Sequence, residues 1–397
     1  MTQLAQRVHN MTESATIAMA AKGRAMKQQG IDVISLSLGE PDFRTPEHIQ
    51  IAAKQAIDDA YFYYTPVPGF LDLREAISTK FKRDNNLHYK PEQIVTSTGA
   101  KQTLVNLMMA LVNPGDEVII PAPFWVSYAG QVELMEGKVV AIQSNIKNNF
   151  KITADQLAAA ITAKTKAFIF SSPCNPTGSV YSKEELAALA QVFAKHPQII
   201  IIADEIYELI NYTGKHHSIG AIESIKNQVV TVNGMSKGFA MTGWRLGYMG
   251  APLEIAKACI KIQGQYTSGT VAITQRAAIA ALNNNYAPSY KMRDAFLKRR
   301  NLVGGLLNDI DGLEVNIPDG AFYYFPDVSA FYGKSNGDYK IKNNNDVSDY
   351  LLEKAHVATV SGAAFGNANC IRLSYASAEN VLIEAVSRIK EALSKLS

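Results

Sequence analysis

Two residues of this sequence combine types and positions that are suited to covalent chemistry. Lys237 ends the segment 234–237, and Asp204 begins the segment 204–207. A lysine in a dry crevice has its pKa lowered and can attack a carbonyl carbon to form a Schiff base. An aspartate held against a pyridine nitrogen keeps that nitrogen protonated and makes the ring an electron sink. Either residue alone is usually a solvated charge or a cap, but the pair indicates covalent chemistry on a carbonyl compound that carries such a ring.

Groups suited to binding anions and planar rings accompany this pair. Gly99 and Ala100 open a predicted helix, where free backbone N–H groups and the helix dipole favour an anion, although a glycine there could simply serve a tight turn. Arg245 lies eight residues after Lys237 and offers a planar fork suited to phosphate. Arg372 is a second fork, flanked by apolar residues, for which a structural ion pair is the alternative. Trp125 is either a stacking platform or part of the core, and Asn175 and Tyr207 could hydrogen-bond a phenolic oxygen.

These residues follow predicted strands at the point where each strand ends. Short β-branched runs alternate with helical patterns, which favours an α/β fold with a mainly parallel sheet covered by helices on both faces. In such sheets ligands bind outside the carboxyl ends of the strands, so we expect one crevice to collect the residues named above. The predicted strands are residues 94–97, 117–120, 138–142, 167–171, 199–203 and 229–233.

Helix signals agree with this organisation. Leu104, Leu107, Met108 and Leu111 lie on one face of a predicted helix after the first strand, and Ser182 with Glu185 three residues on predicts a capping box. Beyond about residue 290 come a basic helix, a polar surface loop at 333–345 and a final amphipathic helix. We predict an N-terminal arm with part of the small domain at 1–45, a large domain at 46–290 and a small C-terminal domain at 291–397.

Composition limits the partners and the compartment. The chain has 397 residues, 47% hydrophobic residues and a net charge of +3, too balanced for a dedicated nucleic-acid surface. Its three cysteines lack the spacing of a zinc site or the density of a disulfide framework, which favours a reducing compartment. The longest aliphatic run, residues 199–203, is too short to cross a membrane. We therefore expect a cytoplasmic protein with no metal, no nucleic acid and no membrane among its partners.

The motifs resemble those of the class I pyridoxal-phosphate aminotransferases over nearly the whole chain. The resemblance implies fold type I of the pyridoxal-phosphate-dependent transferases, with a seven-stranded sheet in the large domain and a smaller α+β domain. The matching parts are residues 37–43, 64–69, the loop at Gly99, residues 175–178 and 204–207, Ser236 and Lys237 with Arg245, and Arg372.

The same resemblance implies a role for each matching residue. Lys237 would carry pyridoxal 5'-phosphate as a Schiff base and shuttle the α-proton, with Asp204 at the ring nitrogen and Tyr207 and Asn175 at the phenolic oxygen. Trp125 would stack on the ring, and Gly39, Trp125, Asn175 and Arg372 would contact the substrate. The implied phosphate ligands are Gly99, Ala100, Ser236 and Arg245, with Tyr64 contributed by the other subunit of a homodimer, and Lys101 is also implied to bind the cofactor.

Within this family the chain looks most like the prokaryotic-type aspartate aminotransferases. Residues 63–66 and 240–245 carry this likeness, together with Lys101, which in that branch reaches the side-chain carboxylate of the substrate. The implied reaction is ping-pong transamination between an amino acid, first of all L-aspartate, and a 2-oxo acid, 2-oxoglutarate. Relatives that also accept prephenate carry a basic residue where this chain has Thr12, which argues against that activity here.

Three other functions fit parts of the sequence. An aminotransferase for aromatic or other amino acids would share the same motifs. A serine hydrolase would use Ser236, because residues 234–238 fit a nucleophile elbow, but His356 is the only histidine after it. A ligand-binding regulator with the same fold would need an additional segment, and no helix-turn-helix pattern precedes the first family motif.

Overall fold

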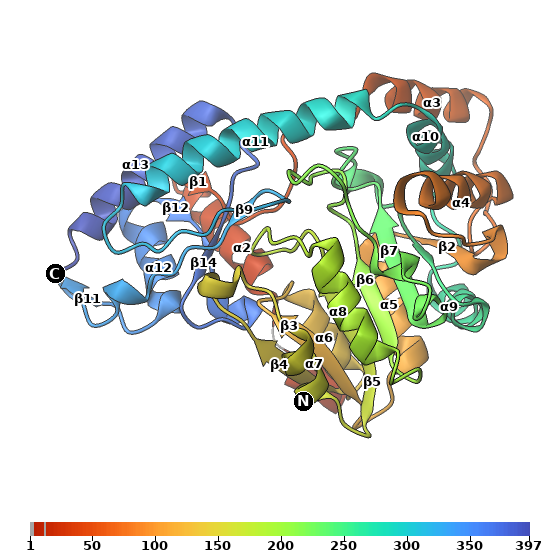
Figure 1. Cartoon of the computed structure of the whole chain (residues 1–397). Helices are drawn as coiled ribbons and strands as arrows, with labels where there is room; N and C mark the ends of the chain where they lie inside the picture. The colour runs from red at the N-terminus through yellow and green to blue at the C-terminus, as the bar shows by residue number, and fades with distance from the viewer. Residues whose placement is uncertain (1–3, 12) are drawn as a thin grey trace.

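The computed structural model describes residues 4–11 and 13–397, and a seven-stranded sheet forms its centre (Figure 1). The strand order is β2-β8-β7-β6-β5-β3-β4, and every neighbouring pair is parallel except the two pairs that include β8. This confirms the predicted mainly parallel α/β sheet. The strands are β2 (Ile94–Ser97), β3 (Glu117–Ala122), β4 (Lys138–Gln143), β5 (Thr165–Ser171), β6 (Ile200–Asp204), β7 (Val229–Gly234) and β8 (Gly247–Gly250).

Helices cover both faces of this sheet because its buried strands are apolar on both sides. Val118 and Ile120 pack into one core with α5, α6 and α9, whereas Ile119 between them packs into another core with α8. A third core joins α3, α4 and α10 near β2 and β8. The helices are α3 (Glu47–Asp58), α4 (Leu71–Asn85), α5 (Ala100–Leu111), α6 (Ser127–Leu134), α7 (Ala154–Ala160), α8 (Lys183–Phe193), α9 (Leu253–Tyr266) and α10 (Ala272–Asn283).

The predicted helix signals appear as local structure. Helix α5 follows β2 directly, and Leu104, Leu107 and Met108 are buried. Helix α8 begins after a capping box: the backbone N–H of Glu185 donates to Ser182 Oγ at 3.2 Å, and the N–H of Ser182 donates to the Glu185 carboxylate at 2.7 Å. Both helices therefore start where the sequence places them.

A separate apolar core lies beside the large sheet. It joins residues from 36 to 43 with helices from the C-terminal third of the chain and a three-stranded sheet of order β13-β14-β9. Residues 333–345, predicted as a loop, contain a short hairpin of β10 and β11. The elements of this region are α11 (Ala287–Asn308), α12 (Asn344–Lys354), α13 (Glu379–Ser394), β9 (Tyr323–Tyr324), β10 (Ser335–Asn336), β11 (Tyr339–Lys340), β13 (Val360–Ser361) and β14 (Ile371–Ser374).

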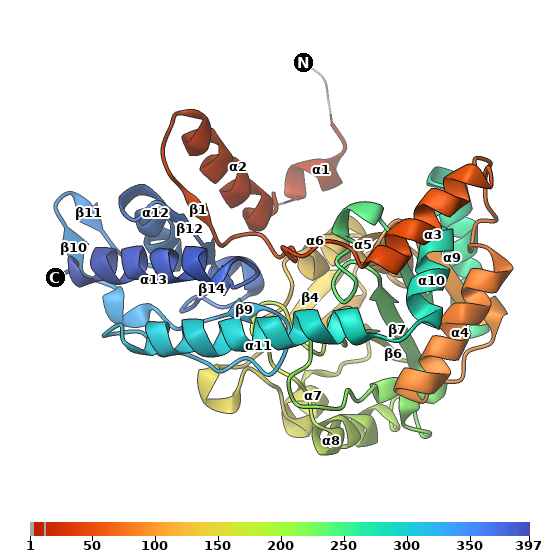
Figure 2. The ribbon, with the colours of Figure 1, turned by 90° about the horizontal axis from the view of Figure 1, so that it is seen from above.

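The N-terminal segment joins this second region before the chain enters the large sheet. Strand β1 (Ile34–Ser35) pairs in parallel with β12 (Val357–Ala358), and helices α1 (Gln6–Asn10) and α2 (Ala15–Gln28) precede it. Helix α11 runs unbroken from the region of α10 to that of α13 (Figure 2). Residue 290 lies inside this helix, so a boundary there would fall within a continuous element. The three-part division of the chain stays a prediction.

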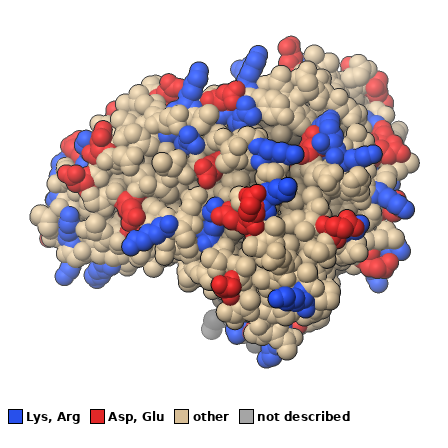
Figure 3. Space-filling view, in the orientation of Figure 1, with Lys and Arg blue, Asp and Glu red and all other residues tan. Residues whose placement is uncertain are grey.

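Surface properties agree with the composition. Basic and acidic side chains are interspersed over the face shown in Figure 3, without a large area of one sign. Within residues 4–11 and 13–397, no helix has both the length and the apolar character that a membrane span requires.

Strand β8 was not predicted, and glycine explains both its weak signal and its position. Its sequence, Gly-Tyr-Met-Gly, contains no β-branched residue. A Cβ at Gly247 would lie 2.1 Å from the backbone nitrogen of Ala100, so the strand approaches the start of α5 more closely than any side chain would allow.

Gly247→Ala should therefore destabilise the protein by at least about 2 kcal/mol, because the added methyl group would clash with backbone atoms, which cannot change rotamer to make room for it. Urea unfolding of this variant and the wild type measures the difference. Gly243→Ala is the control, since no atom lies within 4 Å of its added Cβ. Equal stabilities of Gly247→Ala and Gly243→Ala would contradict this account of β8.

Candidate active site

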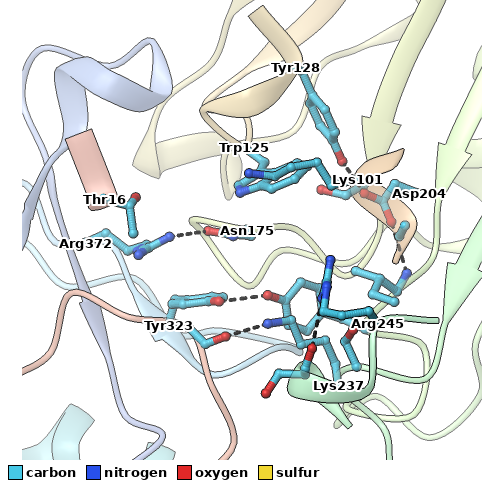
Figure 4. A pocket seen from close by; sticks show the side chains of 17 residues that line it. Thr16, Lys101, Trp125, Tyr128, Asn175, Asp204, Lys237, Arg245, Tyr323 and Arg372 are labelled. Atoms are coloured by element: carbon cyan, nitrogen blue, oxygen red, sulfur yellow. Dashed lines mark hydrogen bonds between the residues drawn. The ribbon is translucent and has the colours of Figure 1, made fainter. Parts of the chain in front are cut away.

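A cavity of about 320 Å³ lies at the carboxyl ends of the central strands, between the large sheet and the second region (Figure 4). Most of the predicted site residues line it. These are Gly39, Ala100, Lys101, Trp125, Asn175, Asp204, Tyr207, Ser236, Lys237, Arg245 and Arg372. The expectation that one crevice collects them is met by the geometry, because parallel strands end at the same edge of a sheet.

Lys237 reaches into this cavity from the turn after β7. Its Nζ donates a hydrogen bond to the carbonyl oxygen of Gly39 at 2.5 Å, which connects the large sheet to the N-terminal segment. Burial lowers the pKa of the Lys237 ammonium to about 8, although the charge of Glu40 partly opposes this effect. About one tenth of this amine is therefore neutral and nucleophilic at pH 7, a far larger share than for a lysine with a pKa near 10.4.

Asp204 ends β6 and is buried at the side of the cavity. Burial raises the pKa of its carboxyl group to about 6, while a hydrogen bond from Tyr128 acts in the opposite direction. Tyr128 Oη donates to Asp204 Oδ2 at 2.7 Å, and the backbone N–H of Ile206 donates to Oδ1 at 3.2 Å. The carboxylate is thus held in one orientation by two donors from different elements.

Groups suited to an anion gather at the start of α5. Gly99 precedes the helix with a positive φ of 87°, and the described residues offer no hydrogen-bond acceptor to the N–H groups of Ala100 and Lys101. The guanidinium of Arg245 lies against Gly99, where an added Cβ would be 2.3 Å from Nη2. It donates to the carbonyl oxygens of Thr242 and Thr98 at 2.8 and 3.2 Å rather than to a carboxylate.

Arg372 enters the cavity from β14 in the second region. Its Nη1 donates to Asn175 Oδ1 at 2.9 Å and its Nη2 to the carbonyl oxygen of Ser37 at 2.5 Å. Its Nε is buried without a hydrogen-bond partner, and no acidic side chain of the described residues pairs with it. The structural ion pair that the sequence left open for Arg372 is therefore absent from the described part of the chain.

Three of the predicted site residues have contacts with other side chains of the site. Asn175 turns its amide oxygen toward Arg372, and Tyr207 Oη is 2.7 Å from Tyr323 Oη. Trp125 has the ammonium of Lys101 4.9 Å from its ring centroid. Burial, followed by the charge of Arg245, lowers the pKa of Lys101.

The sequence singles out two further positions, Tyr64 and Thr12. Tyr64 is 98% exposed and lies outside the cavity of its own chain. Thr12, the position linked to prephenate, lies outside the described residues.

Several lining residues were missed by sequence reasoning. Tyr128 lies three residues after Trp125 but shows no motif of its own, and Tyr323 comes from a two-residue strand far along the chain. Thr16, at the start of α2, points its side chain toward the region of Arg372 (Figure 4). Among the described residues, the lining residues that the sequence did not indicate are Thr16, Tyr128, Ser171, Ile206, Thr242 and Tyr323.

The arrangement offers an amine for an aldehyde, a carboxylate for a ring nitrogen and free donors for a phosphate. No histidine of the described chain lines the cavity with Ser236, so the lining does not supply the base that a serine hydrolase requires. A buried guanidinium with an unpartnered Nε indicates that a further anion is accommodated beside the ring site. These donors fit pyridoxal phosphate with an amino acid.

Fold and site together define a fold type I pyridoxal-phosphate-dependent transferase. The chain belongs to the family of class I and II aminotransferases, whose model matches residues 31–389. As a member of this family the chain is an aminotransferase, and its cofactor is pyridoxal phosphate.

Named relatives are similar over their full length. The aspartate/prephenate aminotransferase of Nitrosomonas europaea is 45% identical, over 99% of this chain and 100% of the relative. The aspartate aminotransferase of Bacillus subtilis is 44% identical over the whole of both chains. The crystal structure of an aspartate aminotransferase from Rhizobium meliloti superposes with a TM-score of 0.97 at 43% identity and covers both chains completely.

The lowered pKa of Lys237 has a measurable consequence in the protein without cofactor. Cyanate reacts with the neutral amine, so its reaction with Lys237 should level off above about pH 8, whereas ordinary lysines, with a pKa near 10.4, continue to react faster as the pH rises. Peptide mass spectrometry after short exposures gives both rates, with the exposed lysines as the internal reference. A rate at Lys237 that keeps rising to about pH 10 would contradict the lowered pKa.

Proposed function

We propose that this chain transfers the amino group of L-aspartate to 2-oxoglutarate by a ping-pong reaction, with pyridoxal phosphate joined to Lys237. The single observation that carries the proposal is the placement of a partly neutral amine and an oriented carboxylate in one cavity, with an arginine free of acidic partners opposite them. The names of the relatives support aspartate as the substrate.

Each end of the cofactor has candidate ligands. Ala100 and Lys101 would hold the phosphate through their backbone N–H groups, assisted by Ser236, the close approach at Gly99 and the guanidinium of Arg245. Asp204 would hold the protonated ring nitrogen. Tyr207 and Asn175 would hydrogen-bond the phenolic oxygen, which requires Asn175 to share its amide between that oxygen and Arg372. Trp125 would cover one face of the ring.

When bound, pyridoxal phosphate supplies an electron-withdrawing ring that stabilises negative charge at the substrate Cα. The chain provides the proton transfers and the orientation. Lys237 Nζ takes the α-proton and returns it, for which an amine with a pKa of about 8 is well matched near neutral pH. Asp204, with a pKa of about 6, is largely ionised under the same conditions and keeps the ring nitrogen protonated.

Substrate recognition would depend on two cations. Arg372 would grip the α-carboxylate, since its fork has no acidic partner of its own and its Nε is unsatisfied. The Gly39 segment would contact the same carboxylate. Lys101 would reach a second carboxylate, and an ammonium at this position favours a dicarboxylic over an aromatic side chain.

We also propose that the chain works as a cytoplasmic homodimer. Phe62, Tyr63 and Tyr64 are large side chains that are more than half exposed, which is unusual for a surface in contact with water alone. Tyr64 would reach the phosphate in the cavity of the partner subunit. The three cysteines are free thiols, which agrees with a reducing compartment.

Lys237→Ala should lower aspartate–2-oxoglutarate transamination roughly 1,000-fold or more, because both the covalent attachment and the proton transfer are lost. A coupled assay of oxaloacetate formation and the absorbance of the bound cofactor provide the measurements. Lys138→Ala, at an exposed strand residue, is the control. Activity near that of the wild type in Lys237→Ala would rule out the proposed function.

Arg372→Lys should raise the KM for aspartate roughly 10- to 100-fold while the cofactor stays bound, because lysine keeps the charge but loses the two-pronged fork. Steady-state kinetics and the cofactor absorbance separate these two effects. Arg276→Lys removes a comparable fork, paired with Asp72 away from the cavity, and serves as the control. An unchanged KM for aspartate in Arg372→Lys would remove this residue from the substrate site.

Tyr64→Phe should weaken cofactor binding roughly 10-fold or more, since a hydroxyl that bonds a charged phosphate is lost. Tyr63→Phe is a closely matched control, because this neighbouring tyrosine is 84% exposed. Cofactor titration gives the dissociation constants, and sedimentation velocity shows whether each variant is a dimer. A monomeric wild type, or equal constants for the two variants, would exclude the role of Tyr64 across an interface.

A further inference from the structure

A second group of buried charges lies directly behind Asp204. The next residue, Glu205, does not line the cavity but belongs to a cluster formed by α4, the turn after β6 and the segment 216–218. Glu205 and Glu208 supply two carboxylates, both buried. Adjacent residues of the chain thus place carboxylates in two separate buried environments, one in the candidate active site and one outside it.

Hydrogen bonds connect the members of this cluster. Asn85 Nδ2 donates to Glu208 Oε2 at 2.8 Å, to Glu205 Oε2 at 3.2 Å and to Ser218 Oγ at 3.0 Å. Ser218 Oγ donates to Glu205 Oε2 at 2.7 Å. Lys80 Nζ donates to Asn85 Oδ1 at 2.7 Å and forms an ion pair with Glu208. Lys80 thereby neutralises one of the two carboxylates.

His216 is the residue able to neutralise the other carboxylate. Its Nε2 lies 3.0 Å from Glu205 Oε2, and its side chain is only 8% exposed. The contact lacks the alignment of a hydrogen bond, so its main component is the attraction between an imidazolium and a carboxylate. With His216 protonated the cluster contains two positive and two negative charges, and with His216 neutral it retains one negative charge.

Other charged groups near His216 do not replace it. Arg83 and Asp84 of α4 line the shallow cavity outside His216, but they pair with each other. Lys183 of α8, Lys215 and His217 line the same cavity, and none of them pairs with Glu205. Glu205, Glu208 and His216 could in geometry hold a metal ion, but Lys80 already brings its ammonium to Glu208.

We propose that His216 is a positioning residue for the transamination: as an imidazolium paired with Glu205 it keeps the buried cluster neutral and so preserves the ionised, correctly held state of Asp204. This inference rests on the proposed function, in which Asp204 holds the ring nitrogen. A net negative charge in the cluster would disfavour the ionised form of Asp204, because the carboxylates of Asp204 and Glu205 belong to consecutive residues and repel each other.

Two electrostatic effects agree with this geometry. Burial lowers the pKa of His216, but the charge and proximity of Glu205 outweigh it, so that the pKa is raised above its ordinary value. The charge of Glu205 is also one of the influences that raise the pKa of Asp204, after the larger effect of burial. Neutralising Glu205 therefore favours the ionised form of Asp204.

The first test measures stability against pH in the protein without cofactor. A histidine whose pKa rises on folding stabilises the fold below its unfolded pKa of about 6.5, and this contribution is lost as the pH rises through the folded pKa. The difference in free energy of unfolding between wild type and His216→Gln should therefore be largest below about pH 6.5 and shrink as the pH rises above that value. His217→Gln is the matched control, and Glu205→Gln/His216→Gln should recover the stability at low pH because it restores neutrality.

The second test follows the cofactor absorbance of the loaded protein against pH. In His216→Gln an unbalanced negative charge behind Asp204 should shift the pH midpoint of this absorbance change upward by roughly 0.5 pH unit. The midpoint of His217→Gln should equal that of the wild type, and the double variant Glu205→Gln/His216→Gln should return to it. A pH dependence of stability in His216→Gln equal to that of the wild type would overturn the proposal. The proposal would also be overturned if His216→Gln lost stability while the pH midpoint of its cofactor absorbance stayed at the wild-type value, because His216 would then have a purely structural role. A wild type that took up no cofactor would count against the proposed function, and the stability comparison alone would then decide whether His216 balances the cluster.

Discussion

The desolvation of two ionisable groups is the constraint on which the rest of the site depends. The same cavity lowers the pKa of Lys237 to about 8 and raises that of Asp204 to about 6, because burial disfavours the charged form of each. Neither side chain has a direct ionic partner among residues 4–11 and 13–397: Lys237 donates to a backbone carbonyl, and Asp204 accepts from a tyrosine and a backbone amide. A bound ring with an aldehyde at one position and a basic nitrogen at another would react with the Lys237 amine and pair with the Asp204 carboxylate. The chemistry therefore follows from two buried ionisable groups that lack ionic partners.

Sheet geometry brings the functional groups to one edge of the sheet, and glycine residues allow the backbone and Arg245 to approach the start of α5 closely. Parallel strands deliver Asp204 and the turn at Lys237 to one edge, while the antiparallel strand β8 returns the chain to the start of α5. Because Gly247 and Gly99 carry no side chains, the backbone of β8 and the guanidinium of Arg245 both approach the helix N-terminus. Arg245 itself has a positive φ of 55°, and its guanidinium donates to the carbonyl oxygen of Thr98, just before this end of the helix. The anion-binding corner thus depends on backbone proximity as much as on charge.

The predictable part of the structure was the part with local signals. The β-branched strands, the capping box of α8 and the residues that follow the strand ends were all found from sequence, because each depends on neighbours within a few positions. Tyr128 and Tyr323 were not found, since their partners Asp204 and Tyr207 lie 76 and 116 residues away and a lone tyrosine has no distinctive pattern. Strand β8 was missed because a strand that begins and ends with glycine is formed by its neighbours rather than by its own propensity. The role proposed for Tyr64 depends on a second chain, so the contacts within one chain carry no signal of it.

The hydrogen bonds of Arg372 suggest how the two regions of the chain would respond to a substrate. In the described structure this buried guanidinium connects β14 to Asn175 of the large sheet and to the Ser37 carbonyl, while its Nε remains unsatisfied. A carboxylate is a stronger acceptor for a guanidinium than an amide oxygen is, so a substrate would compete with Asn175 for the same fork. Release of the Asn175 oxygen would in turn leave that amide free to orient toward the ring site. Substrate binding at the second region and hydrogen bonding at the large sheet would therefore be coupled through this one side chain, which is buried and connects both regions.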